Sequence, residues 1–320
     1  MCAAPFLPID RASGQMRGMA GSQPGSVVVP GNHDGVHVGH QALLARARAL
    51  AKDRGLEVVA LTFDPHPMVT VAPERAPVAL TTLAYRTELL LGAGADRVEV
   101  ARFDAAYAAQ TAEQWITNEL SSRLGAKAVV VGVDFRFGKG RGGDLDGLRA
   151  MGAIRGIAVD AVGEVRASDT HERASSTAIR VALARGDVQH AAVLLTRPHS
   201  VDGLVVEGHK RGRTIGFPTA NLAPDPILLP LDGVYAVRVR TSDGTWHDGV
   251  ANLGSRPTFA AGRSLEAHLF DFAGDLYGSR VRLAFFARLR GEQKFDGVEA
   301  LVAQIRLDAD TARELLARLA

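Results

Sequence analysis

From residue 26 onwards, short apolar runs alternate with stretches that repeat apolar residues at helical spacing. The apolar runs are SVVVPGN, EVVALTF, KAVVVGV and IAVDAVGEV, and the stretches between them include HQALLARARALAKDRG and STAIRVALARG. Continuous apolar runs are typical of buried strands in a parallel sheet, in which helices connect the strands and cover both faces. The pattern predicts an open α/β domain with a mostly parallel, Rossmann-like sheet over residues 26–186.

The pattern changes near residues 185–200, where helical text gives way to shorter, turn-punctuated runs. The new strand candidates are VDGLVVEG, GVYAVRVR, WHDGVANLG, SLEAHLFDF and RVRLAFFARLR, with Gly, Asp and Pro clusters between them. The last 24 or so residues return to helical spacing. We therefore predict a small antiparallel β-barrel with a C-terminal helix over residues 187–320. Residues 1–25, rich in Gly, Ser, Pro and Met, are predicted to form a flexible extension.

Composition narrows the range of partners. A chain of 320 residues favours two domains with separate cores. The 37 basic and 35 acidic residues are interspersed, so no basic stripe indicates a nucleic-acid or membrane partner. No apolar run reaches the roughly 18 residues that a membrane span needs. The single cysteine, Cys2, excludes an internal disulfide framework and favours a cytoplasmic location.

The string GNHDGVHVGH, residues 31–40, lies between the first predicted strand and the first predicted helix. A strand, a glycine-containing turn and a helix N-terminus together form an anion site, because unpaired backbone N–H groups face the ligand. His37 and His40, three residues apart, are expected on one face of the first turn, where imidazoles can donate to phosphate oxygens. Taken alone, the two histidines also fit a helix cap and a surface side chain.

The whole string resembles the signature of the HxGH nucleotidyltransferase superfamily. Its longer form, GNxDGVHxGHQ, resembles the bacterial bifunctional riboflavin kinase/FMN adenylyltransferases, also called FAD synthetases. The resemblance implies that the N-terminal domain transfers AMP from ATP to FMN, giving FAD and pyrophosphate. It implies that His37 and His40 are catalytic, and that the ATP contacts include Gly31, Asp34, Gly35 and Gly39.

Three further strings in the first domain support the resemblance, although each alone also fits a strand exit, a solvated turn or a helix cap. TFDPHP follows the second run, where open α/β sheets bind ligands. VGVDFRFGKGRGGD is a glycine-rich basic loop, and SSTAIR contains serines that can cap the next helix. The resemblance assigns FMN contacts to Phe63, Pro65, His66, Pro67, Asp134 and Phe135, adenosine contact to Asp144, and triphosphate contacts to Ser176, Thr177 and Arg180, with Arg180 in a catalytic role.

The string GHKRGRTIGFPTANL, residues 208–222, combines three glycines, three nearby cations and the neutral oxygens of Thr219 and Asn221. It lacks the P-loop pattern, and alone it also fits a basic β-turn. It resembles the riboflavin kinase barrel, which implies a Mg²⁺ site at Thr219 and Asn221, because Mg²⁺ prefers oxygen ligands. Glu266 is implied to be the base that accepts the proton of the riboflavin 5′-hydroxyl. The remaining implied contacts are Gly208, Lys210, Arg211, Gly212, Arg213 and Gly216 to ATP, and Arg290 and Phe295 to the flavin.

The sequence departs from the family at a few positions. His33 stands where the family has Phe, which predicts slightly weaker adenylyl transfer, and His209 and residues 198–200 also differ.

Two alternative functions also fit parts of the sequence: a flavin-binding regulator without catalysis, and an aminoacyl-tRNA synthetase relative. Intact catalytic positions argue against the first, and the lack of a KMSKS-like loop argues against the second. The expected partners are riboflavin, FMN and ATP, with self-association left open.

Overall fold

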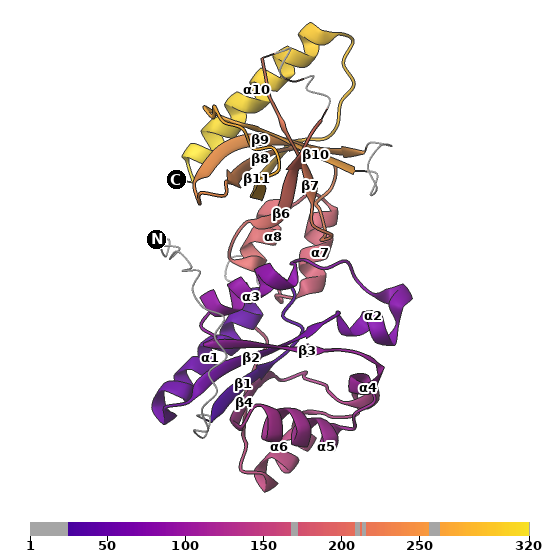
Figure 1. Ribbon diagram of the computed structural model, residues 1–320, viewed down its shortest axis with the longest axis vertical. Helices are drawn as coiled ribbons and strands as arrows, with labels where there is room; N and C mark the ends of the chain where they lie inside the picture. Colours follow the sequence, from indigo (N-terminus) through magenta and orange to yellow (C-terminus); the bar gives the residue numbers. More distant parts are fainter. Residues whose placement is uncertain (1–24, 168–171, 209–211, 213–215, 256–262, 320) are drawn as a thin grey trace.

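The computed structural model describes residues 25–167, 172–208, 212, 216–255 and 263–319. The predicted flexible extension therefore lies outside the described residues, apart from residue 25. A parallel sheet with its helices and a β-barrel follow one another along the long axis of the molecule (Figure 1). The two predicted architectures are confirmed.

The first domain is built on a five-stranded sheet in the order β3-β2-β1-β4-β5, and all the pairings are parallel. β1 lies in the middle and is buried along its whole length, as its unbroken apolar sequence predicts. The strand bounds are β1 Ser26–Pro30, β2 Glu57–Asp64, β3 Arg97–Arg102, β4 Ala126–Gly132 and β5 Ala158–Val162.

Helices cover both faces of this sheet. Val27 and Val29 of β1 pack in the cluster that contains α1 and α3, whereas Val28 packs in the cluster on the opposite face with η2 and α6. Successive side chains of a strand point to opposite faces, so one apolar run supplies both cores. The helical segments are α1 Val38–Arg54, α2 Pro67–Val71, η1 Pro73–Arg75, α3 Leu83–Gly92, α4 Ala105–Ala108, α5 Ala112–Trp115, the π-helical η2 Ile116–Arg123, η3 Lys139–Arg141 and α6 Leu145–Ile154.

Two helices, α7 (Ser176–Ala184) and α8 (Val188–Leu195), lie between the sheet and the barrel (Figure 1). Their apolar side chains belong to one continuous cluster with Leu80 of the first domain and with Tyr235 and Phe285 of the barrel. The predicted domain limit, between residues 186 and 187, falls between these two helices. The helices therefore connect the two halves through a shared apolar core.

The second domain is a closed barrel of six antiparallel strands in the order β10-β7-β6-β11-β8-β9. α10 (Val298–Ala317) packs on the outside of the barrel through a separate apolar cluster, which confirms the predicted C-terminal helix (Figure 1). The strand bounds are β6 His199–Val206, β7 Ala220–Pro224, β8 Gly233–Arg240, β9 Trp246–Ser255, β10 Arg263–Leu269 and β11 Arg280–Arg290.

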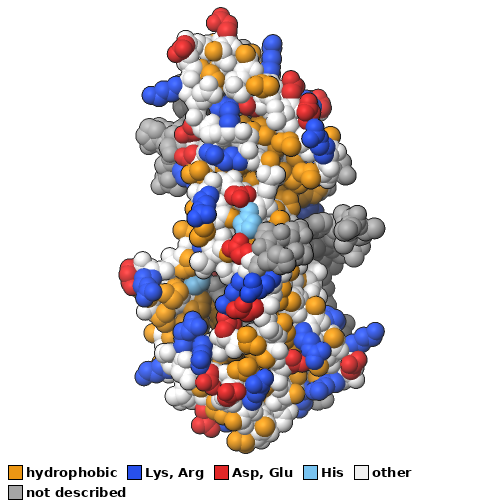
Figure 2. All heavy atoms as spheres, turned by 180° about the vertical axis from the view of Figure 1, so that it is seen from behind, with side chains coloured by type: hydrophobic (Ala, Val, Ile, Leu, Met, Phe, Trp, Pro, Cys, Tyr) orange, Lys and Arg blue, Asp and Glu red, His pale blue; other side chains and the backbone are white. Residues whose placement is uncertain are grey.

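Basic and acidic side chains are mixed over the face of the molecule seen in Figure 2 and do not gather into a patch of one sign. In the parts of the chain that the structure describes, no helix is long and apolar enough to cross a bilayer.

Candidate functional site

A cavity of about 250 Å³ opens at the carboxyl ends of β1, β4 and β5, beside the N-terminus of α1. The chain runs from β1 to β2 on one side of the sheet and later enters β4 on the other side, so the cavity lies at a topological switch point. Open α/β sheets bind ligands at such points. The cavity is lined by Pro30, His37, Gly39, His40, Leu43, Gly132, Val133, Asp134, Phe135, Val162, Gly163, Glu164, Val165, Arg173, Ala174 and Ser175.

The two motif histidines lie together in the wall of this cavity. His37 is the N-cap of α1, and its Nδ1 accepts a hydrogen bond from the Gly39 N–H over 3.2 Å. Its ring stacks on the ring of His40, with centroids 3.8 Å apart. His37 is therefore both a helix cap and a cavity residue. Because Nδ1 is an acceptor, a neutral His37 carries its proton on Nε2.

Burial keeps these imidazoles neutral. Burial, together with the nearby His33 and Arg197, lowers the pKa of His37 to about 4. The pKa of His40 lies well below its usual value for the same reason, with His37 as a second cause. At neutral pH each ring therefore has one N–H donor and no charge, and it is suited to hydrogen-bond an anion without binding a proton.

Because several histidines are buried in the neutral form, we expect the free energy of unfolding to fall in mild acid. Burial lowers the pKa of His33, His37 and His199 to about 4 each, against an ordinary value of 6.5. Between these two values the unfolded chain binds protons that the folded chain does not, so the free energy of unfolding falls as the pH falls from 6.5 towards 4. We expect a loss on the order of 2–3 kcal/mol per histidine, measured by urea denaturation at pH 7.0, 5.5 and 4.5.

His199 offers a control for this acid effect. It is 3% exposed, stacks on Phe285 and shares a hydrogen bond of 2.8 Å with the Leu228 carbonyl oxygen, so it is a core side chain of the barrel. The His199→Phe variant should lose less stability over the same pH range than the parent chain. A pH-independent midpoint in the parent chain would contradict the prediction.

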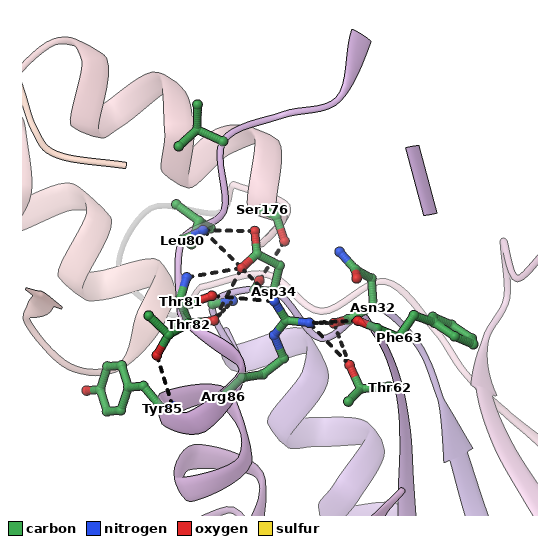
Figure 3. A network of polar contacts seen from close by, with 12 residues as sticks. Asn32, Asp34, Thr62, Phe63, Leu80, Thr81, Thr82, Tyr85, Arg86 and Ser176 are labelled. Carbon is green, nitrogen blue, oxygen red and sulfur yellow. Dashed lines mark hydrogen bonds and ion pairs between the residues drawn. The ribbon is translucent and has the colours of Figure 1, made fainter. Parts of the chain in front are cut away.

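Asp34 anchors the loop that carries the histidines (Figure 3). Its carboxylate, 1% exposed, accepts hydrogen bonds from the backbone N–H of Leu80 at 3.0 Å and of Thr81 at 3.2 Å. Arg180 donates to the same carboxylate and, over 2.9 Å, to the Val78 carbonyl oxygen. In this structure Asp34 and Arg180 thus bind each other, and their predicted contacts with ATP stay predictions.

Arg86, which the sequence reasoning missed, completes this network (Figure 3). Its guanidinium is buried and donates to the carbonyl oxygens of Asn32 at 3.2 Å and Phe63 at 3.3 Å, and it lies 3.8 Å from the Asp34 carboxylate. A buried arginine at this point connects the end of β2 with the histidine loop. An arginine inside an amphipathic helix is usually exposed, so its sequence context gave no signal.

The predicted triphosphate residues of the SSTAIR string lie at the start of α7. Ser175 is the N-cap, accepting from the Ala178 N–H over 3.1 Å, as the helix-cap interpretation expects. The Ser176 hydroxyl donates to the Asp34 carbonyl oxygen over 2.8 Å, and Thr177 follows in the first turn. α7 therefore begins directly beside the histidine loop, as the triphosphate prediction requires.

The predicted FMN residues fall into two groups. Phe63, at the end of β2, packs edge-on against Phe103 with centroids 5.5 Å apart, and His66 caps α2, which begins at Pro67. Asp134 and Phe135, by contrast, line the cavity beside His40. The structure brings the second group to the histidines and leaves the first at the neighbouring strand end, with Pro65 between Phe63 and α2.

Arg173 is a second cavity residue that the sequence reasoning missed. It forms ion pairs with Asp134 and, over 3.2 Å, with Glu164, so that three charged side chains meet in the cavity wall. Arg173 lies two residues before the SSTAIR string, and this position is the one feature of the sequence that could have indicated a role for it. Asp144, predicted to contact adenosine, lies outside this wall: it caps α6 through the Gly147 N–H and pairs with Arg136 at 3.1 Å.

His33 lies behind the motif histidines. It is fully buried, its Nε2 lies 3.0 Å from the Val29 carbonyl oxygen, and its ring meets the His40 ring edge-on at 5.0 Å. Within the described residues its buried Nδ1 has no hydrogen-bond partner. A buried polar atom without a partner is costly, so the ring is a less favourable filler than the family's phenyl group.

We therefore expect His33→Phe to raise the kcat of adenylyl transfer slightly, by about twofold, equivalent to about 0.4 kcal/mol in the barrier. The measurement is the rate of FAD formation from FMN and ATP, with His33→Leu as the variant that removes the imidazole without adding an aromatic ring. Equal or lower activity in His33→Phe would refute the expectation.

The predicted kinase residues form a polar row across three barrel strands. Asn221 of β7 is paired with Glu266 of β10, and Glu266 is paired in turn with Asn252 of β9. Their sequence neighbours Leu222, Leu253 and Leu265 are in the barrel core. Because side chains alternate along a strand, the row lies on the outer face of the barrel. Asn252 was not predicted from the sequence.

A second cavity, of about 550 Å³, lies at the same strands but on the other face of β10, because Ala267 and Leu269 line it and alternate with Glu266 along that strand. Thr219 lies in its wall, directly before β7. The carbonyl oxygen of Pro218, also in the wall, lies 2.8 Å from Nδ1 of His268, which follows Glu266 on the same face of β10. The cavity is lined by Val205, Pro218, Thr219, Ala220, Ala267, Leu269, Phe272, Ala273, Gly274, Asp275, Leu276 and Tyr277.

Of the predicted nucleotide loop, Gly208, Gly212 and Gly216 are described, whereas Lys210, Arg211 and Arg213 lie outside the described residues. A Cβ at Gly208 would lie 2.2 Å from the Asn221 side-chain nitrogen. The loop backbone therefore lies directly against the predicted metal ligand, and a side chain at position 208 would have to displace Asn221.

The predicted flavin residues, Arg290 and Phe295, contact each other, with the guanidinium carbon 5.6 Å from the ring centroid. Arg290 is also paired with the buried Asp308 of α10 at 2.8 Å. The structure thus connects this pair to α10.

Comparisons with known proteins agree with this architecture. The FAD synthetase family model matches residues 20–178, and the riboflavin kinase family model matches residues 195–316. The bifunctional riboflavin kinase/FMN adenylyltransferase of Escherichia coli K12 is 42% identical over 293 residues, 91% of this chain and 93% of that protein. The proteins of the same name from Pseudomonas fluorescens and Bacillus subtilis are 41% and 35% identical, over 94% and 91% of this chain and 97% and 92% of their own lengths.

A solved structure described as a macrolide-efflux protein from Streptococcus pneumoniae is also similar to this chain. It has a TM-score of 0.82 and 33% identity, over 92% of this chain and 95% of that one. Its description differs from the names of the sequence relatives. The two family models agree with the names of the sequence relatives.

Proposed function

The chain belongs to the family of bifunctional riboflavin kinase/FMN adenylyltransferases, and on this premise we propose which of its side chains carry out each reaction. It phosphorylates riboflavin to FMN with ATP and adenylates FMN to FAD. We assign adenylyl transfer to residues 26–186 and phosphorylation to residues 187–320. The alternative of an inactive flavin-binding regulator finds no support in the comparisons.

The stacked pair His37 and His40 carries the assignment of adenylyl transfer to the first cavity. In this reaction a phosphate oxygen of FMN attacks the α-phosphorus of ATP, and pyrophosphate leaves with the electrons of the broken bond. Neutral imidazole N–H groups at the start of α1 would donate hydrogen bonds to the oxygens on which negative charge develops. The N-terminus of α1 adds its own unpaired N–H groups.

The remaining predicted residues support this site in different ways. Asp134 and Phe135 line the same cavity as the histidines, where a flavin phosphate or an adenosine would be bound. Arg180 would need to exchange Asp34 for the triphosphate, since the two side chains are paired here. Arg173 adds a cation at the cavity itself.

For phosphorylation we propose Glu266 as the base. Its carboxylate would accept the proton of the riboflavin 5′-hydroxyl as that oxygen bonds to the γ-phosphorus of ATP, and ADP would leave. The position of Glu266 between Asn221 and Asn252 supports this role, because two amide side chains flank the carboxylate on adjacent strands.

The oxygen donors near this row also fit Mg²⁺. The described residues contain no group of three or more His, Cys, Asp or Glu that could enclose a metal ion. Mg²⁺ usually keeps several waters and binds one or two protein groups together with substrate phosphates, which matches a site with only Thr219 and Asn221. When bound, the ion would neutralise charge on the ATP phosphates.

We also propose a cytoplasmic location. Both reactions consume ATP, and a chain with one cysteine, Cys2, suits a reducing compartment.

The test of the proposed function is a time course of riboflavin, ATP and Mg²⁺ with purified protein, followed by chromatography of the flavins. FMN should appear first and FAD later. The variants described in the Discussion should block the two steps separately. If flavin binds while neither product forms, the assignment of both sites is wrong.

A further inference from the structure

The loop that presents His37 is held in an unfavourable backbone conformation. His33, Gly35 and Val36 have φ values of +52°, +84° and +42°. The left-handed region suits glycine but disfavours a β-branched residue such as Val36. Such a conformation persists only when surrounding contacts hold it. In the described part of the chain, Arg197 and Gln41 are among the side chains that contact this loop.

Arg197, in the segment between α8 and β6, contacts this loop directly. Its guanidinium donates to the carbonyl oxygen of Gly35 over 2.6 Å and lies 3.4 Å from that of Val36. A third bond, of 3.0 Å, goes to the Leu195 carbonyl oxygen at the end of α8. One guanidinium thus connects the two residues directly before His37 to the start of the kinase barrel.

Gln41, in the first turn of α1, strengthens the same connection. Its amide donates to the Val36 carbonyl oxygen at 3.0 Å and to the Thr196 hydroxyl at 2.8 Å. The segment of residues 195–197 therefore contacts the loop on one side of His37 and the helix on the other.

Arg197 also shares an aromatic ring of the first domain with a cation of the barrel. Tyr85 of α3 has the guanidinium of Arg282 at 3.8 Å from its centroid and that of Arg197 at 5.7 Å. Arg282, on β11, is paired with Glu88 of α3 at 2.8 Å and with Asp202 of β6 at 2.6 Å. These two cations and their partners tie the barrel to the helix that also carries Arg86.

We propose that Arg197 is a positioning residue for adenylyl transfer: it holds the carbonyl groups of Gly35 and Val36 so that His37 and His40 keep their place in the cavity. No substrate contact is assigned to it. This inference rests on the proposed role of the two histidines. Arg197 belongs to the segment that leads into the kinase half of the chain. According to this proposal it nevertheless supports the active site of the adenylyltransferase half.

The test compares full-length Arg197→Ala and Arg197→Lys with the parent chain, measuring kcat and KM for FAD formation and the rate of FMN formation in the same preparations. We expect Arg197→Ala to lower the kcat of FAD formation on the order of tenfold to a hundredfold, as for small misplacements of catalytic groups. The KM for FMN and the kinase rate should stay within about twofold. Arg197→Lys, which keeps one donor group, should fall between the two.

Arg48→Ala is the matched control, because Arg48 also donates to a backbone carbonyl, that of Gly94, and to a carboxylate, that of Asp96, in the same domain. FAD formation at the parent rate in Arg197→Ala would overturn the proposal, as would an equal fall in both activities together with the melting temperature. Including His37→Ala separates the two claims: if that variant keeps adenylyl transfer, the proposed function fails, and if only Arg197→Ala keeps it, the inference fails alone.

Discussion

Removing both motif imidazoles should stop FAD formation while FMN formation continues. We expect His37→Ala/His40→Ala to lower the kcat of adenylyl transfer by at least about 10²–10³-fold, the usual cost of losing one preorganised donor to a developing negative charge. The two rings are neutral, and their centroids are 3.8 Å apart. Each substitution by alanine therefore removes one N–H donor from the site and no charge. The measurement is FAD formation from FMN and ATP, with FMN formation from riboflavin in the same sample.

His190→Ala is the matched control for this pair, because His190 of α8 is paired with Glu172 at 2.7 Å and is not in the cavity wall. It should leave both rates unchanged. A double histidine variant that still makes FAD at the parent rate would show that other groups stabilise the leaving pyrophosphate.

Glu266→Gln should have the opposite selectivity. Gln fills nearly the same volume but is a very poor proton acceptor, so we expect the rate of FMN formation to fall by about 10²–10⁴-fold, the usual contribution of a general base. Adenylyl transfer from added FMN should continue at the parent rate, since Glu266 lies on β10 of the barrel. The measurement is initial-rate chromatography with riboflavin in one series and FMN in the other.

Glu299→Gln provides the control, because Glu299 is an exposed carboxylate in the first turn of α10. Its kinase rate should equal that of the parent chain. If Glu266→Gln phosphorylates riboflavin as fast as the parent does, the hydroxyl proton has another acceptor.

The sequence predicted the sheet, the barrel and the C-terminal helix because their apolar runs have clear periods. It missed β3, residues 97–102, whose sequence RVEVAR alternates polar and apolar residues at the edge of the sheet. It also missed β7, since PTANL was interpreted as a motif and has too few apolar residues for a strand prediction. Both segments are short, and neither forms the continuous apolar run by which the other strands of the parallel sheet were predicted.

The site was predictable where neighbouring residues of the chain act together. His37 and His40 share one helix turn, so their contact follows from their spacing. Arg86, Arg173 and Asn252 contribute through contacts with residues distant in sequence, and no local pattern marks them. Asp34 shows the converse. Its motif predicts a contact with ATP, whereas in the structure its carboxylate accepts hydrogen bonds from the backbone N–H groups of Leu80 and Thr81, 46 and 47 residues away.

The contacts of Arg282 with Tyr85 and Glu88 also bear on protein engineering. A chimera that joins this nucleotidyltransferase half to a barrel from another family member would exchange β6 and β11 but keep α3. The grafted barrel would then need a cation at the position of Arg282, to contact the Tyr85 ring and Glu88. It would also need a carboxylate at the position of Asp202, to pair with that cation. The two halves are therefore interchangeable modules only when these interface positions are transferred as a set.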